Sequence, residues 1–147
     1  MATYSFIDVN CSIVGPGVAI TLGNDAGSAE EGISIEMEAD KNNMTIGADG
    51  SGMHSLHAGN AGTVTVRLLK TSPQNALLMA AYNAQRISSS LWGKNVITLV
   101  QSNADDAIVC ASCAFTRQPN LEYATDGGTN TWTFQSTKVT GFLGEYS

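Results

Sequence analysis

The hydrophobic pattern changes its period once, within the stretch from Gly62 to Arg86. From Thr63 to Lys70, apolar and polar residues alternate, which is the period of a half-buried strand. Ser72 and Pro73 follow, as a predicted helix N-cap and first helical residue. We therefore predict a strand that leads directly into a short amphipathic helix at about residues 72–86.

The apolar side of this helix is a single stripe at helical spacing. Its members are Leu77, Leu78, Ala81 and Tyr82. We expect the stripe to pack over the apolar side of the preceding strand, which carries Val64, Val66 and Leu68. The opposite side of the strand carries threonines and Arg67, so it must meet a polar environment.

Shorter alternating runs predict further strands. Gly15-Pro-Gly17 is a turn signal, which predicts a hairpin between Phe6–Val14 and Val18–Leu22. The other expected strands follow the helix: Val96–Gln101, Ala107–Arg117, Leu121–Ala124 and Thr131–Val139, the last two joined by a turn at Asp126–Asn130.

The clearest alternation runs from Glu31 to Asp40 and predicts a strand with one apolar and one strongly acidic face. The apolar face carries Ile33, Ile35, Met37 and Ala39; the acidic face carries Ser34, Glu36, Glu38 and Asp40. After it, Lys41–Asn43 can turn the chain, and Met44–Ile46 is expected to begin a return strand.

The segment at about 47–62 contains five glycines, whose ordering costs the most backbone entropy. We therefore predict a long mobile loop. A purely solvated loop would not carry its apolar residues, and long loops inside compact domains are usually functional. Our hypothesis is that the loop becomes ordered against a neighbouring subunit, through Asp49, Met53, His54, Leu56 and His57.

Together these elements predict one domain over residues 1–147, with about seven or eight strands and a flanking helix. The expected fold class is mainly β, as an antiparallel sandwich or barrel.

Charge is scarce and unevenly distributed. Charged residues make up 14% of the 147 residues, against about 25% in ordinary soluble domains, which suggests an exterior covered by partners. Residues 1–66 carry eight acids and one base (−7), and residues 67–147 carry five acids and six bases (+1). Without clustered Lys and Arg, we expect no stable nucleic-acid binding. We also expect no membrane span and no signal peptide.

Three constellations could carry chemistry. Cys110 and Cys113 have the spacing of a metal or redox pair, but alternation along a strand places them on opposite faces, so buried structural thiols are favoured. His54 and His57 could bind a metal, although two interface histidines fit a glycine-rich loop better. No apolar pocket is in view to raise the pKa of Glu36 or Glu38 for catalysis.

Other chemical motifs are absent from the sequence. It contains no nucleotide-phosphate loop and no serine nucleophile elbow, and three cysteines do not make a disulfide framework. We expect no enzyme activity, no metal and no cofactor.

Several runs resemble the inner tail tube proteins of contractile-tailed bacteriophages, and the similarity spans nearly the whole chain. The runs are Tyr4–Asp8, Gly15–Gly17, Glu30–Ile35, Gly47–His57, Gly62–Pro73, Tyr82–Gln85 and Trp132–Phe134. The resemblance implies hexameric rings of barrel-like subunits, stacked into a hollow tube with their sheets joined around the lumen. It also implies a tail sheath outside, DNA and a tape-measure protein in the lumen, and baseplate and tail-terminator partners. The implied location is the virion, after assembly in the cytoplasm of the bacterial host.

In such a tube, the acidic strand face would line the lumen, and its negative charge would let DNA pass without sticking. Arg67 would lie on this wall too, where we expect it to pair with Glu36 or Glu38. The alternative is that the acidic face is simply an outer, solvated sheet face.

A different class of protein also fits part of the sequence, namely a capsid-decorating or receptor-binding module. Receptor binders usually expose clusters of aromatic residues, whereas Trp92 and Trp132 are isolated beside strand-like runs.

Overall fold

The computed structural model describes residues 2–22 and 28–146. A short 3-10 helix, η1 (Phe6–Asp8), precedes the first strand. The only α-helix of the described residues is α1 (Gln74–Gln85). The strands are β1 (Val9–Gly15), β2 (Val18–Thr21), β3 (Ser28–Met37), β4 (Asn42–Ile46), β5 (Gly52–Leu56), β6 (Gly62–Leu69), β7 (Asn95–Gln101), β8 (Asp106–Arg117) and β9 (Thr129–Phe142).

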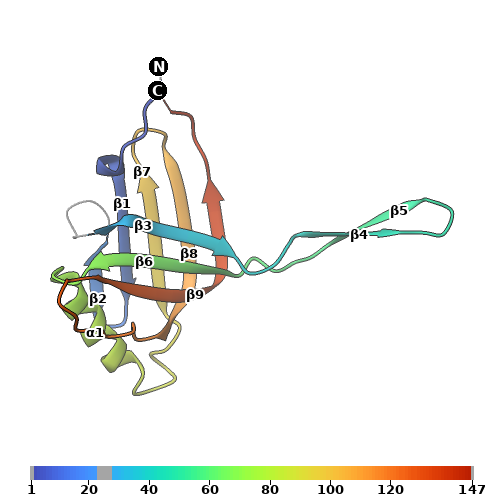
Figure 1. Cartoon of the computed structure of the whole chain (residues 1–147). Coiled ribbons are helices and arrows are strands. Elements are labelled where there is room, and N and C mark those ends of the chain that lie inside the picture. The colour runs from blue at the N-terminus through green and yellow to red at the C-terminus, as the bar shows by residue number, and fades with distance from the viewer. Residues whose placement is uncertain (1, 23–27, 147) are drawn as a thin grey trace.

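Seven strands form one antiparallel sheet in the order β2-β1-β7-β8-β9-β6-β3, and β4 and β5 form a separate two-stranded sheet. The large sheet folds over itself: the antiparallel strands β1, β7 and β8 share one axis, and β3 and β6 cross that axis (Figure 1). The long strand β9 turns from one direction into the other and belongs to both halves (Figure 1). The predicted mainly β, antiparallel fold class with one helix is therefore confirmed.

The core lies between the two halves of the sheet. One half contributes Ile13, Ile97 and Cys110, and the other contributes Val66 and Phe134, all at most 1% exposed. The strict in–out burial of β6, whose even-numbered residues are buried, follows its sequence alternation. The alternation prediction for this strand is thus confirmed.

One strand prediction and one turn prediction were wrong. Residues 121–124 form no strand, because Lys70 holds this connection: its backbone N–H donates to the Gly128 carbonyl (3.1 Å), and its ammonium lies 4.1 Å from the centre of the Tyr123 ring. The Lys70 ammonium also donates to the Glu122 carbonyl. The predicted return at Lys41–Asn43 does not occur, since β4 continues outward there. The hairpin at Gly15-Pro-Gly17 is confirmed by the pairing of β1 with β2.

Helix α1 lies beside β2 at one end of the two layers (Figure 1). Its predicted core stripe is confirmed for Leu78 and Ala81, which are buried, and Tyr82 is half-buried with its ring 5.6 Å from that of Phe115. The prediction was wrong for Leu77, which is 51% exposed, because the buried stripe follows positions 78, 81 and 85 instead.

A buried pair of amides links the end of α1 to the sheet. The Gln85 side chain donates to the Asn95 Oδ1 atom, and Asn95 donates back to the Gln85 Oε1 atom, both at 2.8 Å. A Cβ atom on Gly15 would meet Asn95 Oδ1 at 1.9 Å, so the first hairpin requires glycine there. Helix, β7 and the first hairpin are therefore fixed to one another at this point.

The cysteine geometry differs from the prediction. Ser112 has a positive φ of 51° at a register shift between β7 and β8, and this bulge changes the in–out alternation. As a result, Cys110 and Cys113 are both buried rather than on opposite faces, and the Cys113 thiol lies 3.2 Å from the Cys110 carbonyl. Cys11 is buried as well, and all three thiols are free.

Candidate functional site

The side of the sheet opposite the core is polar where β3, β6, β9 and the end of β8 lie together, and we call it the polar face. Residues that pair across these strands share a side of the sheet. The polar face comprises Ser34, Glu36, Thr63, Thr65, Arg67, Thr131, Thr133, Gln135 and Arg117. Its hydroxyls and charges lie on a continuous surface that the core does not cover.

The charges on the polar face are separated. Glu36 and Glu38 are exposed at the end of β3, where the chain leaves the sheet. Arg67 and Arg117 belong to the opposite end, because Arg67 pairs with Thr131 and Arg117 with Thr133. The polar face therefore has an acidic end and a basic end.

Two side-chain hydrogen bonds on the polar face test the expectation that Arg67 pairs with Glu36 or Glu38. The Arg67 guanidinium donates to the Ser34 hydroxyl at 2.8 Å, so the expected pairing of Arg67 with Glu36 or Glu38 was wrong. The geometric reason is the register, which places Glu36 opposite Thr63, two rows away from Arg67. Thr63 donates a hydrogen bond to Glu38 instead.

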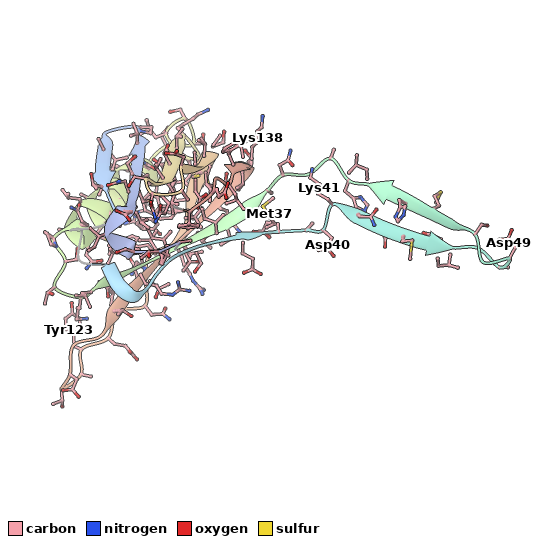
Figure 2. All side chains as sticks on the ribbon, turned by 90° about the horizontal axis from the view of Figure 1, so that it is seen from above. Met37, Asp40, Lys41, Asp49, Tyr123 and Lys138 are labelled. Carbon is pink, nitrogen blue, oxygen red and sulfur yellow. The ribbon has the colours of Figure 1, made fainter. Side chains whose placement is uncertain are left out.

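Asp40 does not share the surface of Glu36. Strand β3 ends at Met37, and Asp40 lies with Lys41 at the root of the projecting hairpin (Figure 2). The expectation that alternation continues from Ser34 through to Asp40 on one sheet face was therefore wrong for its last member.

The most prominent feature is the β4–β5 hairpin, which extends away from the sheet, and we call it the arm (Figures 1 and 2). The segment predicted as a mobile loop at 47–62 is in fact the tip and the second strand of this arm, followed by the start of β6. The prediction failed because residues 42–46 pair with 52–56, and their ladder satisfies the backbone that a loop would leave free.

One side of the arm is apolar although it packs on no core. Met44, Ile46 and Leu56 share this side with His54, in the register Met44↔His54 and Asn42↔Leu56. Leu56 is 85% exposed and Met44 53%. Met53 lies on the other side, opposite Thr45, and is also exposed.

The histidines of the arm do not form a pair. The His54 Nδ1 atom lies 3.2 Å from the Asn42 amide nitrogen. His57 donates its backbone N–H to the Lys41 carbonyl, and by the alternation of β5 its side chain belongs to the other side of the arm. Among residues 2–22 and 28–146, no group of three or more His, Cys, Asp or Glu could hold a metal ion.

Asp49 shapes the tip of the arm (Figure 2). Its Oδ1 atom accepts hydrogen bonds from the backbone N–H (3.1 Å) and the hydroxyl (2.5 Å) of Ser51, and these bonds lower the pKa of Asp49. Gly50 has a φ of +89°, a conformation that favours glycine. The tip is therefore a turn held by the hydrogen bonds of Asp49 and by the backbone conformation of Gly50.

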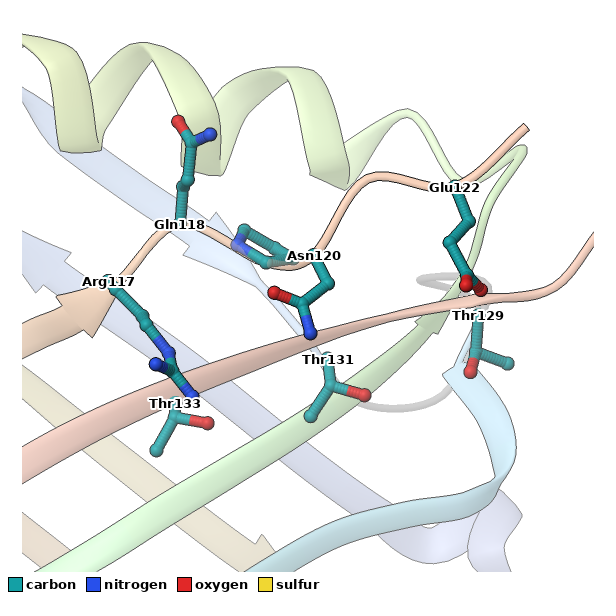
Figure 3. A pocket seen from close by; sticks show the side chains of 8 residues that line it. Arg117, Gln118, Asn120, Glu122, Thr129, Thr131 and Thr133 are labelled. Atoms are coloured by element: carbon teal, nitrogen blue, oxygen red, sulfur yellow. The ribbon is translucent and has the colours of Figure 1, made fainter.

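A polar pocket of about 250 Å³ lies at the basic end of the polar face. The connection after β8 forms one wall with Gln118 and Asn120, and the threonines of β9 form the other (Figure 3). Arg117 and Glu122 stand at opposite ends of this pocket (Figure 3). Sequence reasoning missed it, because nothing in the pattern showed that residues 118–122 would fold back along β9.

No helix in the described part of the chain is both long and apolar enough to cross a membrane.

A family model described as the Bacteriophage PhiTE tail tube protein matches residues 1–144. No curated protein matches the chain.

Solved structures show the same fold at low sequence identity. The sheath/tube terminator of an extracellular contractile injection system, PVC, has a TM-score of 0.62 at 14% identity, covering 97% of this chain and 98% of that one. A chain of the PVC sheath-tube complex has a TM-score of 0.57 at 13% identity, covering 90% and 88%. The tube-terminating cap of the anti-feeding prophage has a TM-score of 0.57 at 12% identity, covering 97% and 94%.

Proposed function

The chain belongs to the family of bacteriophage PhiTE tail tube proteins, and we propose that its copies form hexameric rings that stack into the hollow tube of a contractile tail. As a member of this family, the protein is a structural component of the virion and not an enzyme. The solved structures that share its fold come from a sheath-tube complex, a terminator, a cap and a baseplate. By analogy, its partners are a tail sheath and the terminator and baseplate proteins at the two ends of the tube.

One observation carries the assembly proposal: the arm presents apolar side chains that no part of its own chain covers. Isolated two-stranded hairpins are at best marginally stable in water, so an arm of this length gains stability from a partner. Exposed contiguous apolar surface on a small protein marks an interaction site. We assign the arm, with Asp49, Met53, His54, Leu56 and His57, to contacts between subunits.

The polar face is the surface we assign to the lumen, through Ser34, Glu36 and Arg67, together with Glu38, which lies just beyond the end of β3 and accepts a hydrogen bond from Thr63. Its threonines and exposed carboxylates contact no core, and the acidic end repels phosphate over a Debye length of about 8 Å at physiological salt. DNA and a tape-measure protein would pass over this surface without stable binding. Asp40 contributes its charge from the root of the arm.

The arm gives the direct test. Purified protein is observed by negative-stain electron microscopy, and the Leu56→Ser variant is compared with Ile87→Ser, a matched control because Ile87 is 81% exposed outside the arm. We expect the wild type and the control to form rings and tubes, and Leu56→Ser to remain as folded single particles. Single particles from the wild type, or normal tubes from Leu56→Ser, would contradict the proposal.

A further inference from the structure

The layer formed by β2, β1, β7, β8 and the last part of β9 has an outer side that faces away from the core. The neighbouring residues Ile97 and Cys110 pair with each other and are buried, so the row next to them points outward. This outward row crosses four strands and consists of Ser12, Thr98, Val109 and Thr140.

We call this outer side the neutral face. Further positions on it belong to two more cross-strand sets, which are Val14 with Val96, and Val100 with Ala107 and Phe142. All of these side chains are apolar, and those of the row through Val109 are apolar or carry a hydroxyl. β-Branched residues of this kind suit a flat, pleated surface that is at least half-buried.

Charge is nearly absent from the neutral face. Among the paired residues of the described strands that point to this side, only Lys138 is charged, and it lies at the margin, where it forms a bridge with Asn60. Figure 2 shows Lys138 on the opposite side of the body from Tyr123. The polar face, by contrast, carries both carboxylates and guanidinium groups, so the two outer sides of the molecule differ in chemistry.

The neutral face is open to solvent in a single copy. Phe142 is 68% exposed, Val14 55% and Val109 40%. An antiparallel sheet with one solvated side normally alternates apolar residues inside with polar residues outside, whereas here apolar residues occur on both sides. Depletion of charge is typical of the buried centre of a protein interface. The neutral face therefore has the composition of a surface that a partner covers.

The position of the neutral face selects the partner. The polar face and the neutral face are the outer sides of two layers packed over one core, so they look in opposite directions (Figure 1). If the polar face lines the lumen, the neutral face looks away from the tube axis. Copies in the same ring lie beside it, and copies in the next rings lie above and below it. The partner left to cover it is the tail sheath outside the tube.

We propose that the neutral face is the surface of this chain that the tail sheath contacts, and that it takes an uncharged sheath surface of apolar and hydroxyl side chains. The inference rests on the proposed tube function and adds the chemistry of its outer contact. Close packing of neutral side chains holds the two proteins together here, without pairs of opposite charges.

Placing a charge on the neutral face tests this chemistry. Phage lacking the native protein are complemented with variants, and sheathed tails and bare tubes are counted by negative-stain microscopy. We expect Val109→Lys to form tubes but to lower the sheathed fraction about tenfold, because a buried charge loses hydration without gaining a partner. Val109→Glu should have the same effect, and the uncharged Val109→Thr should stay within about twofold of wild type.

Gln135→Lys is the matched control, because it adds the same charge on the polar face, and its tubes should be sheathed normally. Normal sheathing with either charge at position 109, or an equal loss with Gln135→Lys, would overturn the proposal.

Thr140→Lys covers the case in which a charge at position 109 weakens the fold. Thr140 is exposed and pairs with Val109 in the same row. We expect its tubes to form and to lose the sheath as those of Val109→Lys do. Normal sheathing of Thr140→Lys would overturn the proposal, and so would folded protein that no longer forms tubes, since a second copy would then cover this face.

Photo-cross-linking identifies the partner directly. p-Benzoylphenylalanine replaces Phe142 on the neutral face or, as the control, Tyr123, which is 86% exposed elsewhere. Intact tails are irradiated, and the products are identified by mass spectrometry. We expect a product with the sheath protein from position 142 and none from position 123. A product from position 142 with a second copy alone, or no product, would overturn the assignment.

The two proposals fail separately. If the wild type forms no rings or tubes, the proposed function is wrong. If wild-type tubes form but charges on the neutral face leave sheathing unchanged, the tube function stands and only the sheath contact is wrong.

Discussion

At the residue scale, the amides of Gln85 and Asn95 form a buried pair that joins α1 to β7. Both side chains are at most 1% exposed, and each amide satisfies the other through two hydrogen bonds of 2.8 Å. Removing one partner leaves the other buried without its hydrogen bonds, which costs more than the bonds themselves contribute.

We predict that Gln85→Ala lowers the free energy of unfolding by about 1–3 kcal/mol. Asn83→Ala removes an exposed amide from the same helix and should change it by less than about 0.5 kcal/mol. Urea denaturation followed by circular dichroism measures both variants. Equal stabilities for the two would show that the buried pair contributes nothing specific.

This pair also shows where sequence reasoning reaches its limit. The predicted apolar stripe included Leu77 and left out Gln85, because hydrophobicity alone decided which residues were placed inside. In the structure, Gln85 is buried because an amide from β7 meets it there. A partner ten residues away on another element leaves no periodic signal in the sequence.

The buried thiols give a prediction about pH. Burial raises the pKa of Cys11 from 9.0 to about 12 and that of Cys110 to about 11. Because the unfolded chain loses these protons first, their contribution to stability is complete below pH 9 and is lost as pH rises through 11 to 12. Between pH 8 and 10, we expect a smaller fall in unfolding free energy for Cys11→Ala than for the wild type, as measured in urea. Equal falls would indicate that Cys11 titrates normally in the folded protein.

At the element scale, the arm was not predicted as a hairpin because its turn was expected at the wrong residues. Lys41–Asn43 has the composition of a turn, yet the chain turns at Gly47–Ser51, where the Gly47 N–H donates to the Ser51 carbonyl at 2.6 Å. The strands of the body were predictable, since β6 and β7 pack on a core that enforces alternation. The arm has no core to enforce alternation, so the sequence pattern predicted strand only at Met44–Ile46, within β4, and did not predict β5.

Gly50 should therefore be essential to the arm and irrelevant to the body. With a φ of +89°, a β-branched residue is strained by about 1–3 kcal/mol, so Gly50→Val should open the hairpin. Hydrogen exchange should become faster for amides of β4 and β5 and remain unchanged in β6 and β9.

Gly59→Val is the matched control, because Gly59 has no atom within 4 Å of an added Cβ and no positive φ. Faster exchange in both variants would mean that bulk in this region, rather than the backbone of the turn, opens the arm.

At the scale of the whole molecule, three unsatisfied surfaces lie on different sides of one fold. The arm projects from one end, the polar face covers one side of the two layers, and the neutral face covers the other. A chain with only 14% charged residues has little other surface made for water. The sequence predicted the acidic alternation of β3 and the place of Arg67 on the same wall. It did not predict Arg117, because this residue reaches the face only through the strand order of the folded sheet.

The charge of the polar face can be changed without touching the arm or the neutral face. Gln135 is exposed on this face in β9, between β6 and β8. We predict that Gln135→Lys leaves tube assembly intact but lowers infectivity, because in the proposed hexameric ring it would add six positive charges that hold the phosphates of DNA in the proposed lumen. Gln135→Glu has nearly the same size and the opposite charge, so phage carrying it should infect normally. Complementation of phage lacking the native protein, with tail counts by microscopy and ejection measured by potassium release, separates assembly from passage; normal ejection with Gln135→Lys would place this face outside the lumen.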